Sequence, residues 1–105
     1  MNKDEMLQVF SELAEEILNE KVVIKEEYGL RSEQISIEEQ SIGFSSLELI
    51  EFIIRVEEYY KISITEEEVA KLHLVKDLLE FIDVEKVKQE RRDAAIEAAS
   101  LEIFD

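Results

Sequence analysis

The side chains that could carry catalytic chemistry are few in this sequence. Its 105 residues include one histidine, His73, and no cysteine. A Ser–His–Asp or Cys–His arrangement would therefore depend on that one histidine. Because His73 lies between two leucines, it fits a loop or packing residue better than a general base. The lack of cysteine also excludes disulfides and thiolate metal sites. We predict a protein without a catalytic site of its own.

Acidic residues are numerous, but their spacing does not match a metal site. An EF-hand loop needs acids at alternate positions around a central glycine, which neither Glu38–Glu39 nor Glu66–Glu68 provides. Carboxylates near a helix start are favoured by the helix dipole, and this explains such runs better. The sequence also has no glycine-rich phosphate loop. We therefore expect no metal ion.

The charge balance narrows the choice of partners. Twelve Lys and Arg stand against 27 Asp and Glu, a net charge of −15. This argues against nucleic acid and anionic membranes and favours a basic protein surface. No apolar run approaches the ~20 residues that span a bilayer, and the N-terminus lacks a signal-peptide core. We expect a cytoplasmic monomer without membrane insertion. Acids exceed bases in both residues 1–42 and residues 43–82, so charge alone does not mark a docking face.

One serine stands out at a predicted helix start. Ser45 and Glu48 form a capping box, so Ser46 lies in the first turn, where amides and the helix dipole favour a phosphoryl group. A polar stripe follows along the helix and consists of Glu48, Glu51, Arg55 and Glu58. Glu57 lies beside this stripe. From composition and spacing alone, an ordinary first-turn serine and an ordinary solvated face remain the favoured interpretation.

The elements that position this serine are predicted to be helices, because two Gly and no Pro leave few helix breakers. The pattern predicts a first helix from about Lys3 to Tyr28, with a break allowed near Asn19 and Gly29 as its C-terminal stop. Residues 30–44 read as a long loop that Ile35, Ile37 and Ile42 pin to the core.

Three further helices follow the loop. The second runs from Ser45 to about Tyr60 and buries Leu49, Ile53, Val56 and Tyr60, widened by Ile50 and Phe52. Thr65 and Glu68 form a second capping box, which opens a short helix to about Leu72. A fourth helix begins near Val75, and residues 85–105 either extend it or form a fifth. We divide the chain into a helical domain, 1–84, and a helical extension, 85–105.

Residues 43–82 contain an ordered set of features without a gap. Gly43 and Ser45-Ser46-Leu47 precede an acidic helix ending in Glu57-Glu58-Tyr59-Tyr60; then come Ile62-Ser63-Ile64, Glu66-Glu67-Glu68 and Val75. In this order the stretch resembles acyl carrier proteins, and Tyr28-Gly29-Leu30 with Ile35 resembles the end of that family's first helix. The implied fold is an all-α four-helix bundle with a short third helix and a long loop between helices 1 and 2. The helical C-terminal extension is extra to that fold.

The resemblance also implies a function. Ser46 would take a 4′-phosphopantetheine arm from a phosphopantetheinyl transferase, and the arm's thiol would carry acyl groups as thioesters in fatty-acid, polyketide or a specialised biosynthesis. Glu48, Glu51, Glu57 and Glu58 would dock on basic patches of acyl-transferring, ligase or synthase enzymes. An inter-helix core that can shelter an acyl chain would be lined by Leu47, Ile50, Ile54, Val69, Leu72 and Val75.

Two alternatives remain open. Ser45 stands where the family usually has Asp, which favours an unmodified, degenerate carrier fold that acts purely as an interaction module. An aminoacyl or peptidyl carrier is the other alternative, although the acidic second helix is less typical of peptidyl carriers.

Overall fold

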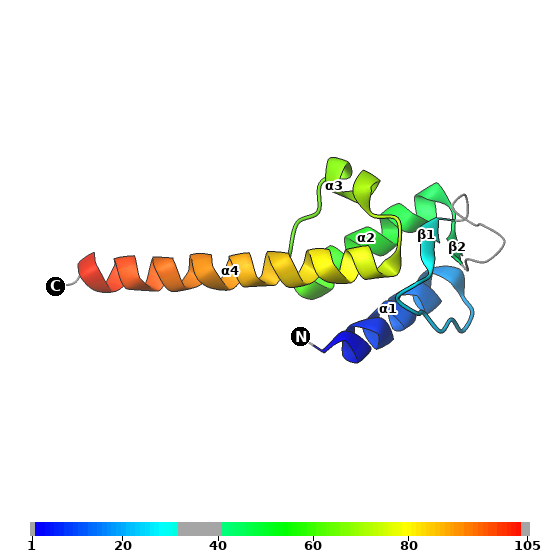
Figure 1. Ribbon diagram of the computed structural model, residues 1–105, viewed down its shortest axis with the longest axis horizontal. Helices are drawn as coiled ribbons and strands as arrows, with labels where there is room; N and C mark the ends of the chain where they lie inside the picture. The colour runs from blue at the N-terminus through cyan, green and yellow to red at the C-terminus, as the bar shows by residue number, and fades with distance from the viewer. Residues whose placement is uncertain (1, 32–40, 104–105) are drawn as a thin grey trace.

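The computed structural model describes residues 2–31 and 41–103. Four helices and two short strands follow one another in this part: α1 (Lys3–Leu18), β1 (Gly29–Arg31), β2 (Ser41–Phe44), α2 (Ser46–Tyr60), α3 (Glu66–Lys71) and α4 (Val75–Ile103). Figure 1 shows α1, α2 and the first part of α4 side by side, with the small α3 beside them. The four predicted helices are therefore present, and the third is the short one.

The first helix ends earlier than predicted. α1 stops at Leu18, and Asn19 caps it in a left-handed conformation with φ 58°, which asparagine tolerates better than most residues. The chain then turns back along α1, where the Ser11 hydroxyl accepts from the Ile24 amide at 3.1 Å. Of our two expectations, the break near Asn19 is confirmed and the continuation to Tyr28 is wrong.

A two-stranded sheet corrects the all-α prediction. β1 pairs in parallel with β2, with Gly29 opposite Ser41 and Arg31 opposite Phe44. Gly29 is thus part of a strand and not a helix stop, and residues 30–31 and 41–44 are not loop. Gly43 has φ +86°, a backbone conformation that a side chain would strain. Ile42 packs against the core as predicted, whereas Ile35 and Ile37 lie outside the described residues.

The segment before β1 is joined to the connection between α3 and α4. Leu30 N donates to the His73 carbonyl, Val75 N to Tyr28 and Lys76 N to Glu26, each at 2.8–2.9 Å. Such long-range backbone pairing cannot be deduced from helical periodicity. It replaces the predicted end of the first helix with an extended segment that holds the start of α4.

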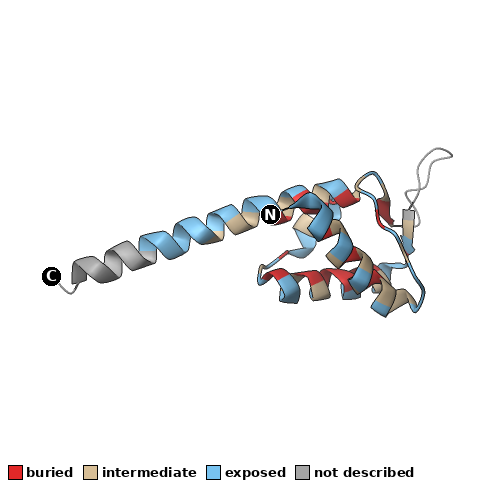
Figure 2. Cartoon of the chain, turned by 90° about the horizontal axis from the view of Figure 1, so that it is seen from below, coloured by how far each residue is buried: buried red, intermediate tan, exposed pale blue. Residues whose placement is uncertain are grey.

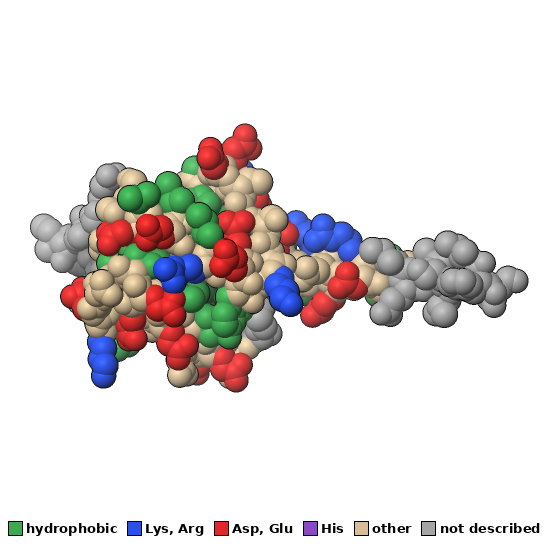
Figure 3. All heavy atoms as spheres, turned by 180° about the vertical axis from the view of Figure 1, so that it is seen from behind, with side chains coloured by type: hydrophobic (Ala, Val, Ile, Leu, Met, Phe, Trp, Pro, Cys, Tyr) green, Lys and Arg blue, Asp and Glu red, His purple; other side chains and the backbone are tan. Residues whose placement is uncertain are grey.

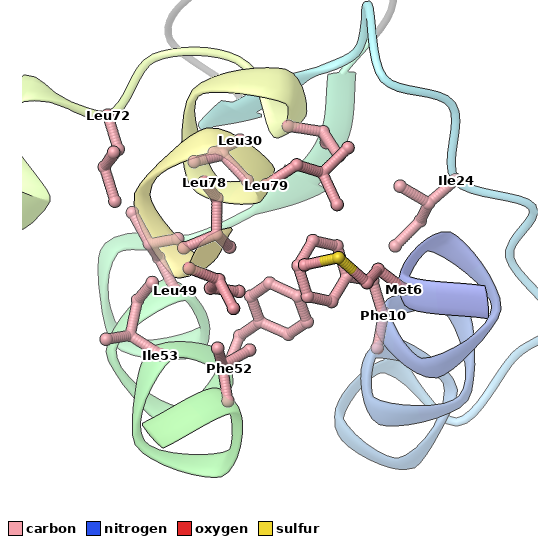
Figure 4. Close-up of a cluster of buried hydrophobic side chains, with 14 of the residues drawn as sticks. Met6, Phe10, Ile24, Leu30, Leu49, Phe52, Ile53, Leu72, Leu78 and Leu79 are labelled. Carbon is pink, nitrogen blue, oxygen red and sulfur yellow. The ribbon is translucent and has the colours of Figure 1, made fainter. Parts of the chain in front are cut away.

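The core lies between α1, α2 and the first two turns of α4. Phe10 and Phe52 are fully buried and meet edge to face, with ring centroids 5.7 Å apart. Figure 4 shows them converging with Met6 and the leucines of α4. Five of the six predicted inward residues of α2 are buried: Leu49, Phe52, Ile53, Val56 and Tyr60. The prediction is wrong for Ile50, which is 53% exposed because it lies at the edge of this face.

α4 continues far beyond this core. Its 29 residues form one helix, so the C-terminal segment extends the fourth helix without a break at Val84. Figure 2 shows mostly exposed residues along α4 where it leaves the helical body, as far as residue 95, and buried residues in the helical body itself. The principal extents of 62 × 24 × 23 Å reflect this projecting helix. The division of the chain into a domain, 1–84, and an extension, 85–105, remains a prediction.

Candidate functional site

The N-terminus of α2 has the capping geometry predicted for it. The Ser45 hydroxyl accepts from Glu48 N at 3.2 Å, and the Glu48 carboxylate accepts from Ser45 N at 2.9 Å. The hydrogen bond from the Ser45 backbone, with a further one from its side chain, lowers the pKa of Glu48 below its usual 4.5. The capping box therefore uses the side chains of Ser45 and Glu48, and it does not use the side chain of Ser46.

Ser46 is the first residue of α2 and its side chain is exposed. Within the described part of the chain, its hydroxyl takes part in no hydrogen bond of the capping box. It lies beside the amides of the first turn and two residues after β2, which holds the approach to the helix. An exposed hydroxyl at a helix N-terminus can accept a phosphoryl group without disturbing the fold, because the dipole there favours negative charge.

The four glutamates predicted to dock partners do not share one environment. Glu51 and Glu58 are exposed on the outer face of α2. Glu48 is half-buried in the cap, and a Glu57 side-chain oxygen accepts from Ile64 N at 3.3 Å. Arg55, which we placed in the acidic stripe, forms an ion pair with Glu16 of α1. The most accessible acids of the four are therefore Glu51 and Glu58.

The six residues predicted to line an inter-helix pocket also differ in their burial. Leu72 and Val75 are buried in the core. Leu47, Ile50 and Ile54 are large exposed hydrophobics, with exposed fractions of 67%, 53% and 47%. Leu47 thus lies outside the core, because the α2 face that carries it is turned about half a revolution away from Leu49 and Ile53. Val69 is partly buried against the core.

A pocket of about 320 Å³ lies between α2 and α3, a volume at the small end of the roughly 300–1,000 Å³ common for ligand sites. Three of the six predicted residues line it: Ile50, Ile54 and Val69. Its other lining residues were not in our prediction: Arg31, Ile53, Glu57, Ile64, Glu66 and Ala70. Figure 3 shows acidic and hydrophobic side chains interleaved on one face of the helical body.

Arg31 is the residue of this site that sequence reasoning missed. Its Nη1 donates to the Leu72 carbonyl at 2.8 Å and its Nη2 to the Val69 carbonyl at 3.0 Å. These contacts span 41 and 38 residues of sequence. Nothing in the local pattern around Arg31 predicts them, since they depend on how β1 meets the end of α3.

His73 has a backbone role in the connection to α4. Its N–H donates to an Asp77 carboxylate oxygen at 3.1 Å, and its carbonyl accepts from Leu30. Among residues 2–31 and 41–103, no group of three or more His, Cys, Asp or Glu side chains could hold a metal ion. No helix in the same ranges has the length and apolar character needed to cross a bilayer.

A body of four helices with an exposed serine at the start of the second helix is consistent with a carrier-type domain, and curated sequences point to the same class. The chain is 31% identical to an acyl carrier protein of Phytoplasma mali over 56% of this chain and 74% of the relative. It is 30% identical to one from Kocuria rhizophila, over 58% and 79%, and 28% identical to one from Trieres chinensis, over 63% and 86%. No protein-family model matches the chain, and no solved structure matches it significantly. The chain belongs to the acyl carrier protein family.

Proposed function

We propose that this protein carries acyl groups on a 4′-phosphopantetheine arm attached to Ser46. The observation that supports this most is the exposed Ser46 at the first position of α2, directly after the N-cap residue Ser45 of a complete capping box. The arm would be joined through a phosphodiester to the Ser46 hydroxyl, where the first-turn amides of α2 favour its negative charge. When bound, the arm supplies the thiol that the chain itself lacks.

The attachment is tested by intact mass. Apo protein incubated with coenzyme A and a broad-specificity phosphopantetheinyl transferase is expected to gain one arm. Ser46→Ala should gain none, and Ser45→Ala, whose hydroxyl belongs to the cap, should still be modified. Lack of modification of the wild type, or equal modification of Ser46→Ala, would refute the proposal and favour an unmodified interaction module.

We also propose that Glu51 and Glu58 steer the carrier to basic patches on its partner enzymes in the cytoplasm. Both carboxylates are exposed on α2, the helix that begins at Ser46. Exposed charges of this kind accelerate encounter more than they tighten binding, which suits a carrier that must leave each enzyme. Glu51→Lys should slow transfer at low salt and leave the melting temperature nearly unchanged. Glu12→Lys, the same charge reversal at an exposed site of α1, is the control.

The enzymes that load the arm determine which group the protein carries and in which pathway it acts. Fatty-acid, polyketide and specialised biosynthetic enzymes would transfer acyl groups to the arm, whereas an aminoacyl or peptidyl carrier would be loaded by an adenylating enzyme. Comparing acyl and aminoacyl loading of the modified protein separates the two classes. The apolar pocket between α2 and α3 favours acyl cargo.

A further inference from the structure

Arg31 lines the α2–α3 pocket, and its backbone lies close to the start of α2. Its Cα is paired with that of Phe44, only two residues before Ser46. The pocket residues Ile50 and Glu57 lie one and three turns further along α2, about 6 and 16 Å from Ser46 along the helix axis. Arg31 therefore joins the segment that leads to Ser46 with the wall of the pocket, which Ile50 and Glu57 also line.

Arg31 also fixes the opposite wall of the pocket. Two of its hydrogen bonds end on carbonyls at the C-terminal end of α3, those of Val69 and of the C-cap residue Leu72. A planar guanidinium grips two acceptors at once, which a lysine ammonium does less well. Because Arg31 belongs to the β1–β2 sheet, the two bonds tie α3 to the segment that leads into α2.

Apart from the Arg31 hydrogen bonds, few contacts hold α3 in place. The helix has six residues, and none of them is buried. Glu66, Val69 and Ala70 contribute the side chains of the α3 wall; Val69 is partly buried and the other two are exposed. A short helix without a buried side chain belongs to the low-stability part of a fold, where the contacts at its ends decide its position. The buried Leu72 and the two Arg31 bonds supply these contacts at its C-terminal end.

We propose that Arg31 is a positioning residue that holds α3 against α2 and thereby limits the length of the acyl chain that the pocket accepts. With α3 held, the pocket keeps its volume of about 320 Å³. Longer chains need α3 to move outward, and breaking the two hydrogen bonds removes the main resistance to that movement. The inference rests on the proposed loading of Ser46, since the chain must start there.

The first test follows α3 itself by amide hydrogen exchange. Arg31→Met keeps an unbranched apolar stem and removes both donors, so exchange of the Val69–Leu72 amides should become about tenfold faster, the effect of losing roughly one net charged hydrogen bond. Lys71→Met, which removes an exposed cation of α3 without a bond to these carbonyls, should exchange like the wild type. Unchanged exchange in Arg31→Met would overturn the proposal.

The second test measures chain length. Hexanoyl, octanoyl, dodecanoyl and hexadecanoyl arms are transferred from the corresponding acyl coenzyme A to apo protein, and the melting temperature of each form is compared with that of the unacylated arm form. In the wild type the melting temperature should rise with chain length only for the shorter acyl chains. In Arg31→Met the rise should continue to the longer chains. Equal length profiles would overturn the proposal while leaving the proposed function intact.

Two further outcomes are decisive. If no arm is attached to Ser46, the proposed function fails and the chain-length limit fails with it, which mass spectrometry shows before any melt is recorded. If Arg31→Met does not fold, Arg31→Lys replaces it: a single ammonium cannot hold both carbonyls, so this variant should show an intermediate exchange rate and an intermediate length profile. A wild-type profile in Arg31→Lys would then overturn the proposal.

Discussion

The C-terminal end of α2 is expected to depend on two side chains of α4. Lys86 Nζ donates to the Tyr60 carbonyl at 3.0 Å, and Gln89 Nε2 donates to the Lys61 carbonyl at 3.1 Å. The last carbonyls of a helix have no partner within the helix, and α2 has no basic residue in its last turn. α4 therefore supplies both the hydrogen bonds and the positive charge that this helix end favours.

Replacing Lys86 by Met removes the charged donor and keeps the stem. A hydrogen bond to a charged group contributes about 1.5–3 kcal/mol, and Lys86 is partly exposed, so we expect a loss of about 1–2 kcal/mol. For a domain of this size each kcal/mol lowers the melting temperature by about 4–8 °C, so Lys86→Met should melt roughly 5–15 °C below the wild type.

The matched control is Lys88→Met, in the same helix two residues away. Lys88 forms an exposed pair with Glu85 at 3.4 Å, and such pairs contribute about 0.5 kcal/mol or less. Gln89→Ala should cost about 1 kcal/mol, and its effect should not add fully to that of Lys86→Met, because Lys86 also donates to the Gln89 side chain at 3.0 Å. Equal melts for Lys86→Met and Lys88→Met would refute the reasoning.

The same contacts bear on where the helical domain ends. Truncation after Arg92 keeps Lys86 and Gln89 and should melt near the full chain, whereas truncation after Val84 removes both and should melt clearly lower. Equal stability of the two truncated chains would support the division of the chain after Val84. A stability that requires residues 85–92 would place part of the extension in the folding unit.

Four further predictions concern the helix ends and the core. Ser45→Ala should cost about 1 kcal/mol in a denaturant melt by removing the cap of α2, and Ser45→Asp should keep it. Capping lowers the pKa of Glu48 and of Glu68 below 4.5. The stability that the two carboxylates supply is therefore present above pH 4.5 and is lost as the pH falls through their pKa values in the folded protein. In the double variant Glu48→Gln with Glu68→Gln, the melting temperature should fall less steeply as the pH is lowered. Ile53→Asp would place an unpaired charge at a site 4% exposed and should abolish the cooperative thermal transition. Burial, with the neighbouring Tyr59 adding to it, raises the pKa of Tyr60 to about 12, so ultraviolet titration should show one tyrosine ionising only as the fold is lost at high pH, and Tyr60→Phe should remove that step.

Local signals were sufficient for much of the helical framework. Both capping boxes form as predicted, since each depends on residues three positions apart. The inward face of α2 follows from the helical spacing of its apolar residues, because one face of the helix must pack against the core. The sheet and the end of α1 were missed for the opposite reason: Gly29–Arg31 becomes a strand only because β2 and the start of α4 lie beside it.

The sequence by itself determined the exposed Ser46 after its cap, the acidic surface and the family resemblance, because these depend on residue type and on spacing within one helix. Only the tertiary structure decided which predicted site residues act together. It separates the exposed Ile50 and Ile54 from the buried Leu72 and Val75, pairs Arg55 with Glu16, and brings Arg31 onto the carbonyls of α3. Each of these contacts joins segments far apart in the chain, and packing between elements, which a local pattern does not contain, determines them.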